Sequence, residues 1–413
     1  MTSMFENTKV AIIGLGYVGL PLAVEFGKKM PTLGFDINKS RVDELKSGSD
    51  FTLECSKEEL KDAEFLTYTA DLNELKEANV YIVTVPTPID EHKQPDLTPL
   101  IKASEALGSI VSKGDVLIYE STVYPGATEE TCLPVVERVS GLTFNVDFFA
   151  GYSPERINPG DKEHRVTNIL KVTSGSNDEI AEFVDQLYKT IITAGTHKAS
   201  SIKVAEASKV IENVQRDVNI ALINELHQVL QKLEINTHEV IEAAATKWNF
   251  MKLKPGLVGG HCIGVDPYYL LHKSTISGYV PDLMRQAREI NDNMPAYLAN
   301  DFLHSLIKNK INPINCKIAL LGFTFKENCP DIRNTKVYEL FLALTKLGFD
   351  VDIVDPWADK NEVIHEYSLE IQSSVTFSEY DALFLTVGHD ELIDLCKKEN
   401  NKFIYDFKGF LTV

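Results

Sequence analysis

One cysteine near the middle of the chain lies in a glycine-rich stretch. Cys262 follows Gly256, Gly259 and Gly260, and Asp266 comes four residues after it. Because glycine has no side chain and tolerates either sign of φ, a ligand can approach such a loop closely. A thiolate there could act as a nucleophile, and the carboxylate could hold water or move a proton. A buried, unreactive thiol beside a tight turn explains the same residues, since free cysteines are among the most buried residue types.

Near the N-terminus, glycines recur at the spacing of a dinucleotide-binding loop. A β-branched run at 9–13 leads into Gly-Leu-Gly-Tyr-Val-Gly at 14–19, and the apolar segment at 20–26 is expected to be helical. A second predicted strand at 32–35 ends in Asp36, 22 residues after Gly14. The glycines let backbone N–H groups reach a pyrophosphate, while the acid accepts hydrogen bonds from ribose hydroxyls. A carboxylate would repel a 2′-phosphate, so the fingerprint favours NAD over NADP. The alternative is a glycine turn that only packs a helix on a sheet.

Polar side chains follow three more predicted strands, at 80–85, 116–119 and 148–152. The carboxyl ends of parallel strands meet at one edge of a sheet, where α/β proteins bind ligands. Solvated loops have the same composition, so each loop alone is weak evidence for a site. The side chains of interest are Thr87, Thr122, Glu155 and Arg156.

A long helix is expected from about 201 to 234. Apolar residues recur at intervals of three and four: Ala207, Ile211, Val214, Val218, Leu222, Leu226, Val229 and Leu233. A second, polar row contains Glu206, Lys209, Asn213 and Arg216. Lys209 and Asn213 are one turn apart and project together. Either this row is a solvated face, or it is buried between domains and serves a site.

The α/β pattern restarts after residue 316, without a second GxGxxG motif. Predicted strands lie at 317–322, 351–356, 382–387 and 403–406. At 413 residues the chain exceeds the size of a single core. We therefore predict an α/β protein with two Rossmann-like, doubly wound parallel-sheet domains joined by a long central helix. The expected divisions are an NAD-binding domain at 1–200, a helical linker and dimerisation region with the Cys262 loop at 201–300, and a second Rossmann-like domain at 301–413.

The composition excludes several classes of partner. A net charge of −19 disfavours nucleic acid and anionic membranes. The sequence contains no apolar run of about 18 residues that would span a membrane, and we expect no signal peptide. The six cysteines are scattered without CxxC pairs, which indicates reduced thiols and a cytoplasmic location.

Together these motifs resemble the nucleotide-sugar 6-dehydrogenases, the family that includes UDP-glucose and GDP-mannose dehydrogenases. The resemblance rests on the segments at 14–19, 153–161, 259–269 and 322–326 and covers essentially the whole chain. It is strongest for the UDP-N-acetylhexosamine (GlcNAc or GalNAc) branch, which serves Vi-type capsular and O-antigen polysaccharides in bacteria. The family implies oxidation of a sugar C6 alcohol to a carboxylate with two NAD⁺, a UDP-sugar-binding C-terminal domain, and a homodimer formed through the connecting helix.

The resemblance also implies roles for individual residues. Cys262 corresponds to the nucleophile that forms a thiohemiacetal and then a thioester. Lys209 and Asn213 would stabilise the alkoxide or oxyanion, Asp266 would orient or activate water, and Glu155 would take part in thioester hydrolysis.

Other positions correspond to binding residues of the family. On the substrate side these are Glu155, Arg156, Lys209, Asn213, Gly259 and Lys326, and Thr122 lines the reaction centre. On the NAD side they are Gly14, Gly16, Tyr17, Val18, Gly19, Asp36, Arg41, Thr87, Thr122 and Arg333.

Two positions depart from the UDP-glucose enzymes. Pro159 stands where those enzymes have a second glutamate, and His261 stands where they have serine before the cysteine. Both differences favour a 2-acetamido sugar. His261 could lower the pKa of Cys262, contact the sugar, or simply fill the loop.

Several alternatives stay open. The same chemistry could act on UDP-ManNAc, UDP-glucose or GDP-mannose, because pocket shape decides the configuration at C2 and C4. A two-electron hydroxy-acid dehydrogenase would not need Cys262. A sugar epimerase would need Tyr-x-x-x-Lys, a pattern that Tyr269 and Lys273 match by chance beyond the linking helix. A non-catalytic NAD or UDP-sugar sensor would not need the set of reactive residues.

Overall fold

The computed structural model describes residues 7–157, 165–399 and 401–411. The chain forms two compact units. Unit 1 comprises Met1–Glu212 together with Tyr268–Gly278, and unit 2 comprises Asn213–Pro267 together with Tyr279–Val413. The chain therefore passes from unit 1 into unit 2, returns for one short segment, and then completes unit 2.

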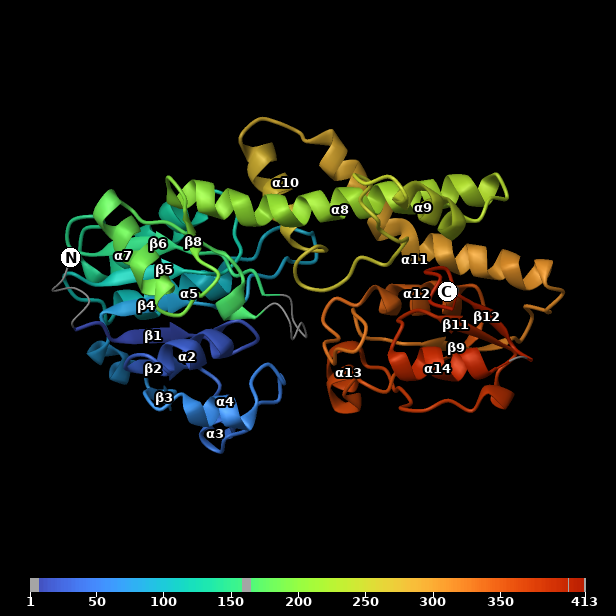
Figure 1. Ribbon diagram of the computed structural model, residues 1–413, viewed down its shortest axis with the longest axis horizontal. Coiled ribbons are helices and arrows are strands. Elements are labelled where there is room, and N and C mark those ends of the chain that lie inside the picture. The colour runs from blue at the N-terminus through green and yellow to red at the C-terminus, as the bar shows by residue number, and fades with distance from the viewer. Residues whose placement is uncertain (1–6, 158–164, 400, 412–413) are drawn as a thin grey trace. The chain divides into compact units, whose positions relative to one another are not determined.

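Unit 1 is built on a six-stranded, fully parallel sheet in the order β3-β2-β1-β4-β5-β6. Its strands are β1 (Val10–Ile13), β2 (Thr32–Phe35), β3 (Leu66–Thr69), β4 (Val80–Val83), β5 (Val116–Tyr119) and β6 (Phe149–Tyr152). The strand order reverses between β1 and β4, which is the point where doubly wound sheets bind ligands. The expected Rossmann-like fold of this half is confirmed (Figure 1).

Helices cover both faces of this sheet. Successive residues of β1 point to opposite sides, so Ala11 and Ile13 enter one core while Val10 and Ile12 enter the other. One core is closed by α5 (Thr98–Gly108) and α6 (Leu133–Ser140), the other by α2 (Gly19–Gly27), α3 (Lys39–Lys46) and α7 (Asp178–Lys189). Beside them lie α4 (Lys57–Asp62) and the two-stranded sheet of β7 (Lys171–Thr173) and β8 (Thr196–Lys198).

The returning segment is most of helix α10 (Asp266–Ile276), which packs on unit 1. Tyr269 is fully buried and donates its hydroxyl to the Pro88 carbonyl at 3.0 Å. Lys273 pairs with Glu130 at 2.6 Å. Both side chains thus have structural partners, which agrees with reading the Tyr-x-x-x-Lys spacing as chance.

Helix α8 (Ile202–Lys232) begins in unit 1 and ends in unit 2. Its polar row is buried: Glu206 and Asn213 are 0% exposed and Lys209 is 6% exposed. Its apolar side chains at Leu222, Leu226 and Val229 are instead 43–51% exposed. A solvated polar face is therefore wrong for the first three polar positions, although Arg216 is exposed.

Unit 2 carries a four-stranded parallel sheet in the order β10-β9-β11-β12. Its strands are β9 (Lys317–Leu321), β10 (Asp350–Val354), β11 (Ala382–Leu385) and β12 (Phe403–Tyr405). One face packs against α11 (Asp282–Lys308), α12 (Lys336–Lys346) and α13 (Lys360–Tyr367), and the other against α14 (Asp390–Lys398). Helix α9 (Thr237–Ala245) follows α8. The second predicted parallel sheet is thus confirmed, and each of its strands lies within two residues of its predicted bounds.

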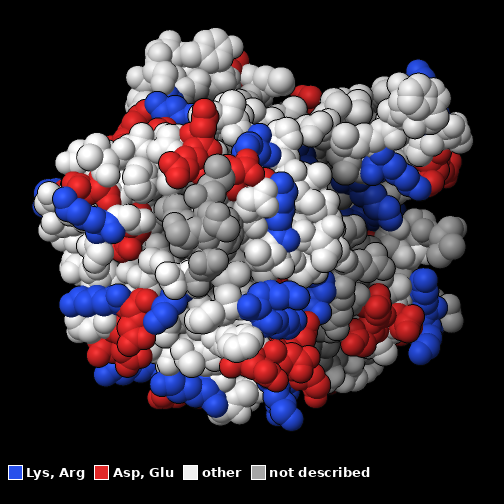
Figure 2. All heavy atoms as spheres, turned by 60° about the vertical axis from the view of Figure 1, so that its left-hand side comes forward, with Lys and Arg blue, Asp and Glu red and all other residues white. Residues whose placement is uncertain are grey.

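Within the part of the chain that the structure describes, no helix has both the length and the apolar character needed to cross a membrane. On the face drawn in Figure 2, acidic and basic side chains are interspersed in small groups.

A buried ion pair joins the second half of α8 to α11. Arg288 donates to Asp217 at 2.5 Å, and Asn291 donates to the same carboxylate oxygen at 2.8 Å. Arg288 and Asp217 are 2% and 1% exposed. Burial raises the pKa of Asp217 above its ordinary value in spite of the Arg288 charge.

We expect Arg288→Met to lower the free energy of unfolding by about 3–5 kcal/mol, because it leaves a buried carboxylate without its cation. Urea denaturation followed by circular dichroism measures this loss. The double variant Asp217→Asn, Arg288→Met should lose less, and Lys252→Met, which removes an exposed pair with Glu242, should not move the midpoint. Equal losses in the first two variants would contradict the assignment.

Candidate active site

The glycine loop after β1 closes tightly against the end of β4. Gly14 has φ +97°, a conformation that L side chains rarely adopt. A Cβ at Gly19 would lie 1.8 Å from the Gly14 carbonyl oxygen. Thr84 donates its hydroxyl to that same oxygen at 2.8 Å. The first and last glycines are thus required by the packing of the loop at the strand-order reversal.

Gly16 has no such packing requirement. It is exposed, and a Cβ there would meet no atom of the described residues within 4 Å. The space beside the backbone is therefore open at the start of α2, where a helix N-terminus favours an anionic group. Tyr17 and Val18, half-buried, complete the loop, and Thr87 is half-buried after β4. This cradle fits a dinucleotide pyrophosphate.

Asp36 and Arg41 hold the loop from the next strand and helix. The Asp36 carboxylate accepts from Leu15 N and from Asn38 N, each at 2.9 Å. A carboxylate has about four acceptor sites, so capacity is left for ribose hydroxyls. Arg41 is buried, and its Nε donates to the Leu15 carbonyl at 2.9 Å while its other nitrogens pair with acidic side chains. Arg41 thus contacts the loop backbone and shapes the cradle.

Glu155 lies in a buried charged cluster after β6. One carboxylate oxygen accepts from Arg156 N and Ile157 N, each at 2.5 Å, and the other accepts from Lys171 Nζ at 3.1 Å. Lys171 also pairs with Glu120 at 2.7 Å. Burial opposes ionisation of Glu155, but Lys171 and the Ile157 N–H outweigh it and hold its pKa below the ordinary value.

Lys209 lies close enough to contribute to the lowered pKa of Glu155. Glu206, one turn before Lys209 on α8, is also hydrogen-bonded. Glu206 accepts from Gly126 N at 2.5 Å and Thr128 N at 2.9 Å, which ties the segment after the half-buried Thr122 to α8. Burial raises the pKa of Glu206 to about 7.

Arg156 already has partners within the protein. Its guanidinium pairs with Glu212 of α8 at 2.5 Å and donates to the Leu170 carbonyl at 2.9 Å. The predicted segment continues at Asn158, Pro159, Gly160 and Asp161, which lie outside the described residues.

In unit 2, Cys262 lies just before α10. Its carbonyl accepts from Asp266 N at 2.8 Å and Val265 N at 3.1 Å. The Asp266 carboxylate is buried and accepts from the Asn213 amide, which in turn accepts from Arg216. The structure thus brings Asn213 to Asp266, 53 residues away in sequence and four residues after Cys262.

Close packing on the loop after β9 explains the glycines before Cys262. A Cβ at Gly259 would lie 2.6 Å from the Asn334 carbonyl oxygen. Gly260 has φ +79°, and a Cβ there would lie 2.8 Å from the Phe325 ring. The Cys262 loop therefore rests on the segment that carries Lys326 and Arg333. Arg333 pairs with Asp331 at 2.5 Å, and Lys326 is half-buried.

Cys262 is the half-buried thiol of the chain, whereas the other five cysteines are buried. Burial raises the pKa of Cys55, Cys132 and Cys396 to about 12, and that of Cys316 to about 11. Thiolate is the reactive form, so these buried thiols are inert. Accessibility thus singles out Cys262.

The neighbouring His261 is neutral at physiological pH. Burial and the Arg333 charge lower its pKa to about 4, and its Nε2 atom has no hydrogen-bond partner among the described residues. A neutral imidazole cannot activate Cys262 through positive charge. Of its three expected roles, a sugar contact and filling of the loop remain.

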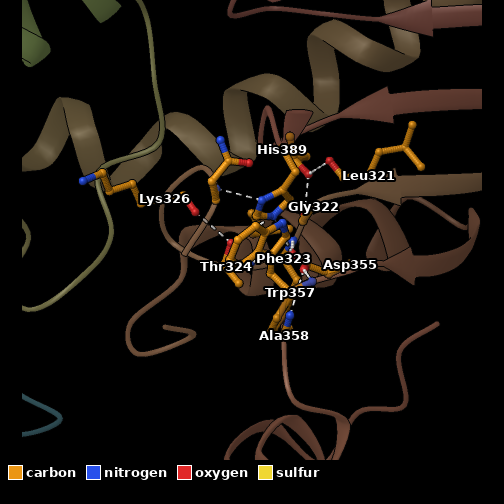
Figure 3. Close-up of polar contacts among 12 residues, drawn as sticks. Leu321, Gly322, Phe323, Thr324, Lys326, Asp355, Trp357, Ala358 and His389 are labelled. Atoms are coloured by element: carbon orange, nitrogen blue, oxygen red, sulfur yellow. Dashed lines mark hydrogen bonds and ion pairs between the residues drawn. The ribbon is translucent and has the colours of Figure 1, made fainter. Parts of the chain in front are cut away.

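Asp355 and His389, which sequence reasoning did not select, organise the strand-order reversal of the second sheet (Figure 3). The Asp355 carboxylate accepts from Phe323 N at 2.6 Å, Thr324 N at 3.0 Å and His389 Nε2 at 3.0 Å. Figure 3 shows the Lys326 side chain extending away from this cluster. The sequence signal that could have indicated this cluster was Asp355, an acid directly after β10 that is followed by a proline.

Sequence models of one family match all three parts of the chain. They describe the NAD binding domain, the central domain and the UDP binding domain of the UDP-glucose/GDP-mannose dehydrogenase family, over residues 8–192, 203–293 and 319–413. The chain belongs to this family. The expected resemblance is confirmed, and the UDP-glucose/GDP-mannose dehydrogenases are NAD-dependent oxidoreductases.

Similar members of this dehydrogenase family are known from bacteria and archaea. The chain is 57% identical to a UDP-N-acetyl-D-glucosamine 6-dehydrogenase of Pseudomonas aeruginosa, over 98% of each chain. It is 55% identical to one of Salmonella typhi, over 98% of this chain and 97% of the relative. A solved UDP-D-ManNAc dehydrogenase from Pyrococcus horikoshii has 29% identity and a TM-score of 0.87, covering 98% of this chain and 96% of the other.

The two glycines give a matched test of the NAD cradle. Gly16→Ala should leave the unfolding midpoint unchanged and weaken NAD⁺ binding about tenfold, about 1.4 kcal/mol, because its methyl group enters only the open space. Gly19→Ala should lower both the midpoint and the affinity, because its Cβ collides with Gly14. Calorimetric titration and thermal unfolding measure the two quantities. Wild-type affinity in Gly16→Ala would show that the pyrophosphate does not approach this backbone.

Proposed function

We propose that this member of the family is a UDP-N-acetyl-D-glucosamine 6-dehydrogenase that oxidises the sugar C6 alcohol to a uronate. The main support for this proposal is Cys262, a half-buried thiol in a glycine loop. The loop leads into Asp266, which accepts a hydrogen bond from Asn213. The two full-length relatives bearing that activity in their names support the choice of sugar. UDP-N-acetyl-D-galactosamine is the second candidate, because the residues of the site do not distinguish the C4 epimers.

The first oxidation uses the polar row of α8. The glycine loop would hold NAD⁺, which would supply the hydride acceptor for each oxidation. As the C6 hydroxyl gives its proton to water, negative charge develops on oxygen. The Lys209 ammonium and the Asn213 amide, one turn apart on α8, stabilise that charge. Lys326, Arg156 and Gly259 are proposed to hold the substrate.

The second oxidation proceeds on Cys262. Its thiolate adds to the C6 aldehyde, forming a C–S bond and a thiohemiacetal alkoxide that takes up a proton. Loss of that proton and of the remaining C6 hydride leaves a thioester. Arg333 and Thr122 are proposed to line the cofactor side of this centre.

Hydrolysis then releases the acid. Glu155 accepts a proton from water as the water oxygen bonds to the thioester carbon. The C–S bond breaks, the Cys262 thiolate leaves with the electron pair, and Asp266 orients the water. This scheme requires that the two units bring Glu155 and Lys209 to Cys262.

The proposal assigns functions along the chain. Residues 1–200 would bind NAD, 201–300 would carry the nucleophile and form a homodimer, and 301–413 would bind the UDP portion. The uronate would serve bacterial surface polysaccharide synthesis. A cytoplasmic location is proposed because the mechanism needs a reduced thiol.

NADH yield per sugar tests the reaction, with UDP-GlcNAc, UDP-GalNAc, UDP-ManNAc and UDP-glucose supplied separately. We expect two NADH per UDP-GlcNAc and the highest kcat/KM with that sugar. Cys262→Ala should release no uronate, because no thioester can form. One NADH per sugar, or wild-type acid release by the variant, would refute the thioester route.

The proposed dimer can be tested by substitutions in the exposed apolar stripe of α8. Glutamate substitutions at Leu226 and Val229 should shift the chain from dimer to monomer, because they place like charges in an interface that would bury apolar surface. Sedimentation velocity measures the shift. Glutamate at Ile314, an exposed apolar residue elsewhere, is the control. An unchanged sedimentation coefficient would place the interface on another surface.

A further inference from the structure

Lys171 is a buried lysine between two buried carboxylates. Its side chain is 4% exposed, and its ammonium lies 2.7 Å from Glu120 and 3.1 Å from Glu155, which are both buried. It also lies 5.4 Å from the centre of the Tyr188 ring. Lys171 and Glu120 take no direct part in the proposed reaction.

Two carboxylates contact one ammonium in this cluster. With both glutamates ionised, Glu120 and Glu155 share the charge of Lys171, and the further positive charge of Lys209 acts on Glu155. Buried charges without compensation are costly, so one carboxyl group favours its neutral form. Interactions specific to each glutamate decide which one keeps the proton.

The two carboxyl groups have unequal hydrogen bonds. Glu155 receives two backbone N–H groups in addition to Lys171, and these donors favour its ionised form. Among the described residues, Glu120 receives only the Tyr188 hydroxyl in addition to Lys171. The asymmetry favours a charged Glu155 and a neutral Glu120.

We infer that Lys171 is a positioning residue that keeps Glu155 ionised and oriented as the base for thioester hydrolysis, while Glu120 carries the proton of the cluster. This inference rests on the proposed function in so far as it assigns the base a task. The division of charge between the two glutamates stands on the cluster alone.

The titration behaviour of the groups agrees with this division. Burial raises the pKa of Glu120 to about 7 in spite of the Lys171 charge. Burial opposes the charge of Lys171, but Glu120 and Glu155 outweigh it and raise its pKa. The groups facing the ammonium are Glu120 after β5, Glu155 after β6 and Tyr188 on α7, and Lys209 on α8 adds positive charge near Glu155.

The arrangement has a pH consequence. As the pH rises through about 7, Glu120 loses its proton and adds negative charge beside Lys171. That charge makes Glu155 a stronger base, so hydrolysis should accelerate over this range. Glu120→Gln keeps the neutral form at every pH and should remove this inflection.

Infrared spectroscopy of the full chain tests the charge assignment without turnover. Between about pH 5 and pH 7, wild type should show the C=O stretch of a buried protonated carboxyl group. The band assigned to the cluster should vanish in Glu120→Gln. In Glu155→Gln it should disappear at a lower pH than in wild type, because the carboxylate that, together with burial, raises the pKa of Glu120 is gone. A band unchanged in Glu120→Gln would overturn the inference.

The positioning role is tested by following decay of the Cys262 thioester by acid quench and intact-mass spectrometry. The double variant Lys171→Met, Glu120→Gln removes the cation together with one carboxyl group, which limits the folding defect. Its hydrolysis should be about 100-fold slower at pH 7 and recover at higher pH, because Glu155 loses the cation that kept it ionised. A merely structural role would lower the rate without pH rescue, and that result would overturn the inference.

Lys198→Met is the matched control, since it removes an exposed lysine of the adjacent strand that pairs with Glu182. It should keep the wild-type rate and pH profile. If wild type forms no thioester with any of the four sugars, the proposed function fails, and the infrared bands still decide the charge assignment.

Discussion

The burial of polar side chains along α8 is the constraint on which the rest of the structure depends. A buried polar group is costly unless it is hydrogen-bonded. Each one therefore holds another segment against the helix. Glu206 holds the segment at Gly126, and Asn213 holds Asp266. Asp217 fixes Arg288 of α11 in the same way. The helix orders loops in both units because its buried polar groups are hydrogen-bonded to protein groups on those loops.

The two parallel sheets use one device to shape their ligand-binding edges. In unit 1, Asp36 follows the second strand of the sheet and accepts from the backbone of the loop after the first, at Leu15. In unit 2, Asp355 follows β10 and accepts from the loop after β9, at Phe323 and Thr324. In each sheet the acid holds the loop at the point where strand order reverses. This explains why the second sheet needs no glycine fingerprint to build an ordered edge.

Accessibility and charge compensation, more than chemical type, separate reactive from structural groups in this chain. Five cysteines are buried, whereas Cys262 is half-buried in a loop that packs through glycines. Likewise, Glu155 stays ionised while Glu120, close to the same lysine, has a raised pKa. The difference lies in two backbone N–H groups that reach Glu155. Local donors thus decide which of two glutamates in one cluster can act as a base.

The sequence by itself determined both parallel sheets, the NAD fingerprint at Gly14 and Asp36, and the prominence of Cys262. These features rest on local patterns: strand-length apolar runs, glycine spacing and strand-terminal acids. Tertiary structure alone decided that Glu206, Lys209 and Asn213 of α8 are buried and that apolar side chains such as Leu222 and Val229 are exposed. Helical periodicity gives two faces without saying which one meets protein. Only the tertiary structure also showed that Lys171 and His389 are buried beside carboxylates. Their partners lie as far as 51 residues (Glu120) and 34 residues (Asp355) away in sequence, and burial and charge pairing depend on such long-range contacts.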